Sequence, residues 1–434
     1  MLWLLFGSFA LLCLLRVPIA FGMFISSTLT IWVQGDVPLS IVTQRVWVGL
    51  NNFPLLAVPF FLFVAQAMNE TGTSQRLIEF SRAIVGWIRG GLAHVTVAVS
   101  MIFAGISGVS SAEALGVGSV MIPAMKREGY PTGFAVALVA ASATLGNIIP
   151  PSLMMIVYAA TAGLSVGAMF LAGIIPGILI GVLQMVYSHR VASKLQIGDT
   201  HPFSVKKLGA STLISWPALL IPILIIGGIL GGWFTATEAS VVSVLYVMLL
   251  AMIYREFSLK RLYKLAEDSI GMFSLSLLCV AAASLWAWIL AFYSVPQGIV
   301  AWFGEAGLLG SQLSIFAVVV FVFLVIGSFM DAVPAIIILQ PIVGEIGAAG
   351  GIDPYHLGIV VVLTLAIGLL TPPYGLCLLI AADLGGMSVA AATKALVPFY
   401  IISFIVVTVA VFAPDFILWI PRAALANLMP GAAP

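Results

Sequence analysis

Long apolar runs, interrupted at a few places by Gly, Ser and Pro, dominate the pattern of this chain. A helix needs about 20 mostly apolar residues to cross a bilayer, and such runs recur from Leu2 to the region around Trp419. The first run, Met1 to Leu15, lacks the basic start of a secretory signal, so we expect a retained first helix. The pattern predicts an all-α polytopic membrane protein embedded in the lipid bilayer.

Two neighbouring apolar stretches are interrupted at their centres. The first, Leu92 to Met125, carries the small and polar run Gly105 to Glu113, which predicts a re-entrant helical hairpin that enters and leaves on one side of the membrane. The second, Thr132 to Thr161, contains Gly146 to Pro151, where tandem proline removes backbone donors. We therefore expect a hairpin followed by a broken helix.

The same pattern recurs 222 residues further along the chain. At this offset the sequence matches itself at a series of positions: Gly105 with Gly327, Gly129 with Gly351, Pro150 with Pro372, and Pro176 with Pro398. A single match would mean little, but the series indicates an internal duplication. The second half is then expected to hold its own hairpin near Asp331 and its own broken helix at 368–373.

Basic residues set the predicted topology, because cytoplasmic loops are enriched in Lys and Arg. We place three clusters in the cytoplasm: Arg76, Arg82 and Arg89; His189, Arg190, Lys194, Lys206 and Lys207; and Arg255, Lys260, Arg261 and Lys264. The span Phe234 to Tyr254 then runs inward, whereas its repeat mate, Leu12 to Gly35, runs outward. Paired interrupted segments in inverted repeats are typical of transporters that bind substrate near the bilayer midplane.

These features divide the chain into six segments. They are the first helices of the first repeat with an amphipathic arm (1–90), the first hairpin and broken helix (91–190), a cytoplasmic linker (191–208), the first helices of the second repeat (209–305), the second hairpin and broken helix (306–420) and a C-terminal tail (421–434).

A broken helix leaves backbone groups without partners in the membrane, and ions or substrate groups can fill that gap. Hydroxyl, carbonyl and carboxylate oxygens are hard ligands suited to Na⁺. We expect sodium ligands at Ser107, Ser110, Gly146 and Asn147 in the first half and at Gly327, Met330, Asp331, Gly368 and Thr371 in the second. Substrate contacts are expected at Ser111, Pro150, Pro151, Pro372 and Pro373.

Competing interpretations exist for each of these residues. Gly, Ser and Pro also permit close helix packing and kinks in membrane proteins, but two repeat-related breaks, each after a polar hairpin, favour the binding site. Asp331 in an apolar run indicates a cavity or a partner, and its alternative role is a helix cap. For Glu113 two roles are weighted equally: a residue of the binding site, or a side chain that stabilises the hairpin through hydrogen bonds to neighbouring amides.

Arg16 and Glu238 stand at equivalent positions of the two repeats. They are candidates for an intramembrane ion pair. The alternative places Glu238 at the outer interface and Arg16 at a lipid headgroup or an anionic substrate, and the sequence does not decide between the two.

Composition and residue inventory exclude other classes of function. Hydrophobic residues make up 62% of the 434 positions and charged residues 8%, with a net charge of +1, so nucleic acid is not an expected partner. The three cysteines are scattered and expected in the core, and the four histidines have no ligand spacing. No nucleophile or ATP-binding grouping is visible, so we expect no enzyme. A respiratory-complex subunit would carry a file of intramembrane charges that this chain lacks.

The sequence resembles a known family, the large membrane subunit of tripartite ATP-independent periplasmic (TRAP) transporters in the ion transporter superfamily. The resemblance covers essentially the whole chain. It rests on ordered motifs: Asn52 to Phe61, Ser107 to Glu113 followed by Ile122 to Met125, Ile149 to Ser152, Phe234 to Ala239, Gly327 to Asp331, and Thr371 to Gly375. Each motif is weak singly, whereas their order is highly specific.

The resemblance implies a sodium-gradient-driven importer of small organic acids (a C4-dicarboxylate, a 2-oxo acid or a sugar acid) in the bacterial inner membrane. It implies two partners, a small four-helix membrane subunit and a periplasmic substrate-binding protein. It also implies an elevator mechanism, in which a transport domain (91–190 and 306–420) slides against scaffold helices (1–90 and 209–305). The family's sodium positions fall on Ser107, Ser110, Gly146, Gly327, Asp331 and Thr371. Glu113 stands where the family usually has Asp, and Val109 where it often has Ser. The alternative is a stand-alone sodium/dicarboxylate symporter.

The topology assignment predicts the accessibility of two engineered thiols. A cysteine replacing Lys206 should react with a membrane-impermeant maleimide only from the cytoplasmic side, and one replacing Trp233 only from outside. Labelling of intact cells and of inverted vesicles separates the two cases, and a reversed pattern would invert the topology.

Overall fold

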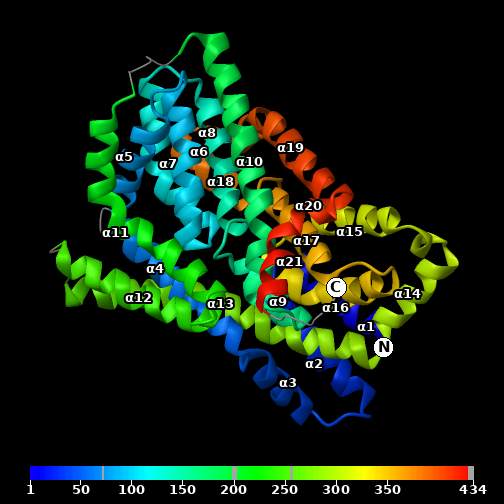
Figure 1. Ribbon diagram of the computed structural model, residues 1–434. Helices are drawn as coiled ribbons and strands as arrows, with labels where there is room; N and C mark the ends of the chain where they lie inside the picture. The colour runs from blue at the N-terminus through cyan, green and yellow to red at the C-terminus, as the bar shows by residue number, and fades with distance from the viewer. Residues whose placement is uncertain (71–72, 198–202, 255–257, 429–434) are drawn as a thin grey trace.

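Helices make up almost the whole of the protein (Figure 1). The computed structural model describes residues 1–70, 73–197, 203–254 and 258–428, and helix accounts for 84% of the structure, with no strand in these ranges. Five helices are long and apolar enough to cross a membrane, and two bent pairs raise the number to as many as seven. The expectation of an all-α polytopic membrane protein is confirmed.

The first half of the chain consists of ten helices with two short 3-10 segments. They are α1 (Leu2–Leu14), α2 (Ile19–Gln34), α3 (Ser40–Leu50), η1 (Phe53–Leu56), α4 (Ala57–Glu70), α5 (Thr73–Val85), α6 (Gly91–Ser107), α7 (Ser110–Arg127), α8 (Thr132–Ala143), η2 (Thr144–Asn147), α9 (Leu153–Ala162) and α10 (Val166–Leu195). The predicted hairpin is α6 with α7, and the predicted broken helix is α8, η2 and α9.

The second half repeats the order of hairpin, broken helix and long helix. Its elements are α11 (Val205–Leu230), α12 (Ala236–Ile253), α13 (Leu259–Phe292), α14 (Val295–Glu305), η3 (Leu308–Gly310), α15 (Gln312–Gly327), α16 (Ala332–Ala349), α17 (Pro354–Gly368), α18 (Leu376–Gly385), α19 (Val389–Phe412), α20 (Pro414–Ile417) and α21 (Trp419–Leu428). Ser110 and Ala332, which begin α7 and α16, stand 222 positions apart, the offset seen in the sequence.

One difference between the halves has a local cause. In the first half α3 and α4 meet at a bend of 60°, whereas α13 runs through the corresponding region as one helix of 34 residues. Pro54 lies in the 3-10 turn at the bend and has no N–H to continue the helix, while the position 222 further on is Ser276. The substitution of serine for proline removes the obstacle to a continuous helix.

The hairpins and broken helices of the two halves interlock (Figure 1). The helix after the first break, α9, packs against α16 of the second hairpin, and the helix after the second break, α18, packs against α7 and α8. The long α13 lies across α2, α3 and α4, and α12 packs against α4. Each half therefore completes the packing of the other half's hairpin.

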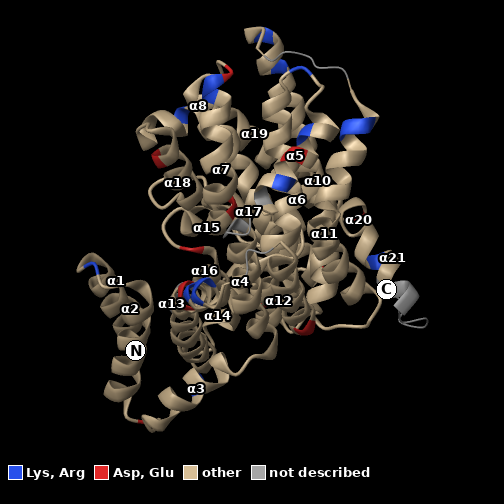
Figure 2. Ribbon diagram, turned by 90° about the vertical axis from the view of Figure 1, so that its left-hand side faces the viewer, with Lys and Arg blue, Asp and Glu red and all other residues tan. Residues whose placement is uncertain are grey.

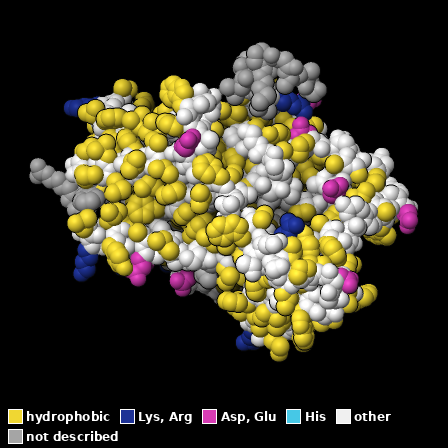
Figure 3. Space-filling view, turned by 90° about the horizontal axis from the view of Figure 1, so that it is seen from below, with side chains coloured by type: hydrophobic (Ala, Val, Ile, Leu, Met, Phe, Trp, Pro, Cys, Tyr) yellow, Lys and Arg dark blue, Asp and Glu magenta, His cyan; other side chains and the backbone are white. Residues whose placement is uncertain are grey.

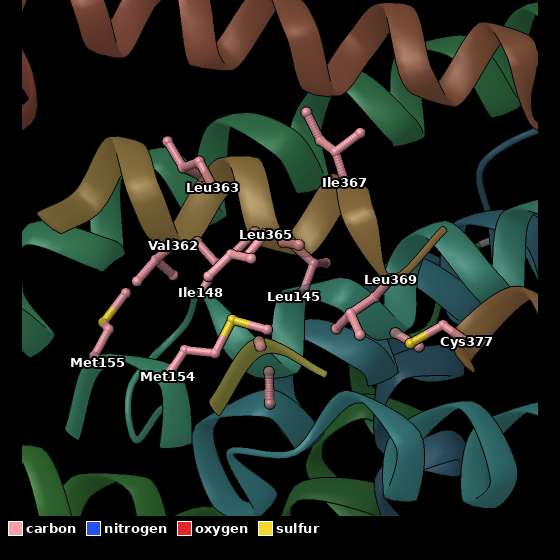
Figure 4. Close-up of a cluster of buried hydrophobic side chains, with 14 of the residues drawn as sticks. Leu145, Ile148, Met154, Met155, Val362, Leu363, Leu365, Ile367, Leu369 and Cys377 are labelled. Atoms are coloured by element: carbon pink, nitrogen blue, oxygen red, sulfur yellow. The ribbon is translucent and has the colours of Figure 1, made fainter. Parts of the chain in front are cut away.

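A dry cluster of side chains fills the space between the two breaks (Figure 4). Leu145 and Ile148 of the first break meet the α17 side chains of Val362 and Leu365, with Met154 of α9 beside them. All five side chains are at most 2% exposed. Close packing of this kind resists compression and transmits displacement, so the cluster holds the two breaks at a fixed separation.

The outer surface is apolar over much of its area, as Figure 3 shows for one face. Trp3 is 92% exposed and Trp233 is 78% exposed, values that suit side chains in contact with lipid. Lys and Arg gather near the upper ends of the helices in Figure 2, and the middle of the bundle holds few charges. Cys13 is exposed on α1, so its assignment to the core was wrong; Cys377 is buried, as expected.

The structure rejects one proposed ion pair. Arg16 is exposed in the turn between α1 and α2, with a φ of 62°, instead of lying within a span. The carboxylate of Glu238 accepts hydrogen bonds from the backbone N–H of Thr235 (2.8 Å) and from its hydroxyl (2.9 Å), forming a capping box for α12. Glu238 is thus committed to its own helix terminus, and in the described residues it does not pair with Arg16.

Three expected features lie wholly or partly outside the described residues. They are positions 198–202 of the expected linker, Arg255 of the third basic cluster, and positions 429–434 of the expected tail. In the described residues, α10 continues to Leu195, inside the expected linker, and α21 continues to Leu428, inside the expected tail.

Candidate functional site

The tip of the first hairpin turns directly against the first break. Gly108 has a φ of 64° between α6 and α7, and a Cβ atom there would lie 2.5 Å from the carbonyl oxygen of Pro151. The carbonyl of Gly108 accepts a hydrogen bond from the N–H of Leu153, at 3.1 Å. Only glycine satisfies both the left-handed conformation and the space, so the sequence specifies this contact.

Side chains join the same tip to the break. The amide of Asn147 donates to the hydroxyl of Ser110 at 2.8 Å, and the N–H of Ser110 donates to Asn147 Oδ1 at 3.4 Å. Ser152 donates to the carbonyl of Asn147 at 2.5 Å and caps α9. Ser110 and Asn147, both expected as sodium ligands of the first half, are therefore in direct contact.

Two buried polar side chains beside this contact are left without a well-formed hydrogen bond in the described part of the chain. They are Ser107, through Oγ, and Glu113, through both carboxylate oxygens. Ser107 borders a cavity of about 10 Å³, together with Gly108 and Pro151. Buried polar groups normally have partners, so these oxygens are the first candidates for ligand contacts.

Glu113 does not brace the hairpin through neighbouring amides, so that alternative was wrong. Its carboxylate lies against Gly146, where a Cβ atom would be 2.7 Å from Oε2, and beside the hydroxyl of Ser100. Ser100 in turn donates to Ser142 at 3.2 Å. The sequence analysis missed Ser100 and Ser142, because single serines in apolar helices give no local signal of a shared polar layer.

The tip of the second hairpin meets the second break in a comparable way. The N–H of Tyr374 donates to the carbonyl of Ser328 at 2.8 Å. Gly327 and Gly368 pack backbone against backbone, since a Cβ atom at Gly368 would lie 2.7 Å from the carbonyl carbon of Gly327. The hydroxyl of Thr371 donates to the carbonyl of Ile367 at 2.9 Å. The hairpin therefore closes this break too.

Asp331 stands at the start of α16 and accepts a hydrogen bond from the N–H of Ala332 through Oδ1, at 2.8 Å. The helix-cap role that the sequence allowed is confirmed, and half-buried Met330 precedes it. A carboxylate has about four lone-pair sites, so capping one N–H leaves capacity for a further ligand. The cap and an ion site are compatible at this residue.

The two tips carry different side chains, and α18, which follows the second break, packs against α7 of the first hairpin. Ser110 and Asn147 correspond in the second half to Ala332 and Leu369, so Asp331 is the polar side chain that distinguishes the second tip. Cys377 of α18 is buried beside the Ser110 hydroxyl, and its N–H donates to the carbonyl of Leu369 at the second break, at 3.1 Å. The sequence assigned Cys377 a packing role only. Its position between the sites depends on the interlocking of the halves.

The expected substrate residues are spread around the two tips. Ser111 is half-buried in the first turn of α7, and Pro150 and Pro151 are buried. Pro372 is half-buried and Pro373 is exposed. Both Pro–Pro peptide bonds, 150–151 and 372–373, are cis. The proline pair of the second break is more exposed to the surroundings than the proline pair of the first.

Residues 6–416 match the family described as tripartite ATP-independent periplasmic transporter, DctM component. The chain belongs to this family. It is 37% identical over 399 residues to the C4-dicarboxylate TRAP transporter large permease protein DctM of Pseudomonas aeruginosa, covering 92% of this chain and 93% of that one. It is 31% identical over 406 residues to the sialic acid TRAP transporter large permease protein SiaM of Vibrio cholerae, covering 93% and 95%.

A solved structure supports the fold of this TRAP permease. The YdaH transporter of Alcanivorax borkumensis superposes with a TM-score of 0.60, at 13% identity, over 88% of this chain and 90% of that one. The resemblance read from the ordered motifs is confirmed. The relatives are named as transporter permeases and not as enzymes, in agreement with the inventory of residues.

The close approach of Gly327 and Gly368 predicts a specific loss of stability. Gly368→Ala should lower the free energy of unfolding by about 1–3 kcal/mol, because the new Cβ overlaps rigid backbone atoms. Thermal unfolding of the detergent-purified permease measures the effect.

Gly227→Ala is the matched control, since a Cβ at this α11 position meets no atom within 4 Å. Alanine has the better helix propensity, so this variant should be as stable as the parent or slightly more stable. Equal losses in the two variants would contradict the assigned contact.

Proposed function

We propose that this TRAP permease is the transporting subunit of a sodium-gradient-driven importer of small organic acids. The observation that carries the proposal is the pair of hairpin tips, each bonded to a broken helix at Gly108 and Ser328 and each lined by oxygen atoms. Such discontinuous helices hold coupling ions and substrate in secondary transporters. No chemical transformation is required of the protein.

The first proposed sodium site comprises Ser107, Ser110, Gly146 and Asn147. The unpartnered, fully buried hydroxyl of Ser107 supports it, because a hydroxyl oxygen in this position supplies a hard ligand for a small cation. The side-chain amide oxygen of Asn147, Oδ1, accepts only a long hydrogen bond, 3.4 Å, and retains capacity for a second contact. Neutral ligands would leave the bound ion's charge to be balanced by Glu113.

The second proposed sodium site comprises Gly327, Met330, Asp331, Gly368 and Thr371. Asp331 contributes the carboxylate, and the other residues contribute backbone or hydroxyl oxygens. A carboxylate within a membrane bundle is expensive unless it faces a partner or a cavity. Binding Na⁺ there would offset the carboxylate's charge, which gives Asp331 a role beyond capping.

The substrate is proposed to bind between the tips, in contact with Ser111, Pro150, Pro151, Pro372 and Pro373. The relatives are named for C4-dicarboxylates, sialic acid and 2,3-diketo-L-gulonate, which are all organic acids. By analogy the cargo is a C4-dicarboxylate, a 2-oxo acid or a sugar acid. Family membership supports delivery by a periplasmic binding protein, assembly with a small four-helix subunit and a bacterial inner-membrane location.

The interlocked hairpins and broken helices support an elevator motion. The fixed separation of the two breaks means that 91–190 and 306–420 would move together as a transport domain, carrying both tips. The scaffold would then comprise 1–90 and 209–305. Alternating access of this kind is rigid-body movement of one bundle against another.

Uptake into proteoliposomes tests the proposed function. The permease and its small subunit are reconstituted, and accumulation of a labelled dicarboxylate, 2-oxo acid and sugar acid is followed with the sodium gradient and the binding protein each present or omitted. Uptake that needs both supports the proposal. Uptake with sodium alone favours the stand-alone symporter, and uptake indifferent to sodium would reject the coupling ion.

Asp331→Asn separates the two roles of this residue. Asparagine caps a helix as well as aspartate does, so membrane insertion and thermal stability should be preserved. Loss of the carboxylate should abolish Na⁺-dependent uptake, because the ion loses its charged ligand.

Asp353→Asn is the control for the Asp331 variant. Asp353 also caps a helix, accepting from the N–H groups of Tyr355 (2.8 Å) and His356 (3.1 Å) at the start of α17, away from both breaks. This variant should transport normally. Normal sodium-dependent uptake by Asp331→Asn would rule out the ion-ligand role.

A further inference from the structure

A further cavity lies outside the transport site, between the amphipathic arm α5 and the first part of α11. Its volume is about 530 Å³. The hydroxyl of Ser215 on α11 donates to the carbonyl of Arg76 on α5 at 2.9 Å and fixes the two helices to each other at the cavity wall. The buried side of α5, with Leu77 and Ile78, packs inward, so its polar face borders the cavity.

The cavity is basic. Arg76, Arg82 and Lys207 line it, together with a single carboxylate, Glu79. The guanidinium of Arg76 lies over the ring of Tyr254, 3.4 Å from the centroid, and its Nη1 has no hydrogen-bond partner among the described residues. In the described chain the one ion pair joins Arg422 and Asp415, so Glu79 forms no ion pair with these cations. The cavity thus presents unpaired positive charge.

An apolar surface adjoins these cations. Trp87 and Phe203 meet edge to face at 6.0 Å where they line the cavity. Beyond them, the exposed side of α11 carries Leu213, which is 75% exposed, and Trp216, which is 50% exposed. Cations beside an apolar face with aromatic side chains match the boundary between headgroups and acyl chains in a bilayer.

We propose that this cavity binds one anionic phospholipid. Its phosphate would contact Arg82 and Lys207, and its acyl chains would follow the exposed face of α11. Guanidinium groups bind phosphate oxygens through paired charge-assisted hydrogen bonds, and basic pockets on the cytoplasmic side of membrane proteins select anionic lipids. The apolar face favours a lipid over free phosphate as the source of the anion.

The bound lipid would join two parts of the chain that differ in role. The arm α5 leads through Gly90 into the first hairpin, whereas α11 leads into α12, which packs against α4. A lipid held by both helices would restrain the arm relative to α11. This inference concerns binding alone and does not depend on the proposed sodium coupling or cargo.

Lipid binding to the full-length, detergent-purified chain tests the proposal. Native mass spectrometry follows titrations with dioleoylphosphatidylglycerol and with dioleoylphosphatidylcholine, which has the same acyl chains and no net charge. We expect one tight phosphatidylglycerol and no comparable phosphatidylcholine. Arg82→Gln with Lys207→Gln should weaken phosphatidylglycerol binding about 30-fold, since each basic residue contributes about a factor of five.

The matched control is Arg89→Gln with Lys206→Gln, which removes two nearby charges that do not line the cavity. Its affinity should equal that of the parent. Ala210→Trp provides a variant that keeps every charge and fills the cavity from α11, and it should also lose the tight lipid.

Three results would overturn the proposal. One is equal phosphatidylglycerol affinity in the cavity double variant and its control. Another is undiminished binding in Ala210→Trp. The third is displacement of phosphatidylglycerol by millimolar inorganic phosphate, which would assign the cavity to the free ion.

Discussion

The backbone groups released by the two broken helices are the constraint on which this structure depends. Lipid offers such groups no hydrogen bonds, and the protein supplies them from the hairpin tips. The carbonyl of Gly108 receives the N–H of Leu153, and that of Ser328 receives the N–H of Tyr374. A hairpin tip therefore has to lie at each break, which brings small residues and oxygen atoms together at the same two places.

The same constraint explains how the halves share their packing. Each hairpin tip packs against the break of its own half. The rest of the hairpin is covered by the helix that follows the break of the other half: α18 packs against α7, and α9 packs against α16. Leu145, Ile148 and Leu365 fill the space between the breaks. Because this cluster is closely packed and resists deformation, it holds the two breaks at a fixed separation.

The two tips are not chemically equal. Ser110 and Asn147 bond to each other in the first, whereas Ala332 and Leu369 stand at those positions in the second, and Asp331 supplies the polar group there. Both tips give a backbone carbonyl to their break, but the turns differ: Gly108 is left-handed, whereas Ser328 is in the right-handed helical region. The two tips therefore present different polar groups to their breaks.

The sequence by itself determined the helices, both breaks, the hairpins and the family, because Gly, Pro and apolar runs act locally on the backbone and the ordered motifs repeat. It also assigned Ser110 and Asn147, which bond to each other, to one expected site. Only the tertiary structure decided that Glu113 lies against Gly146 and Ser100, that Cys377 stands between the sites, and that Glu238 caps α12 without pairing with Arg16. Most of these contacts join side chains from different helices. Which helix faces meet is decided by packing in three dimensions, and the order of residues along the chain does not contain that information.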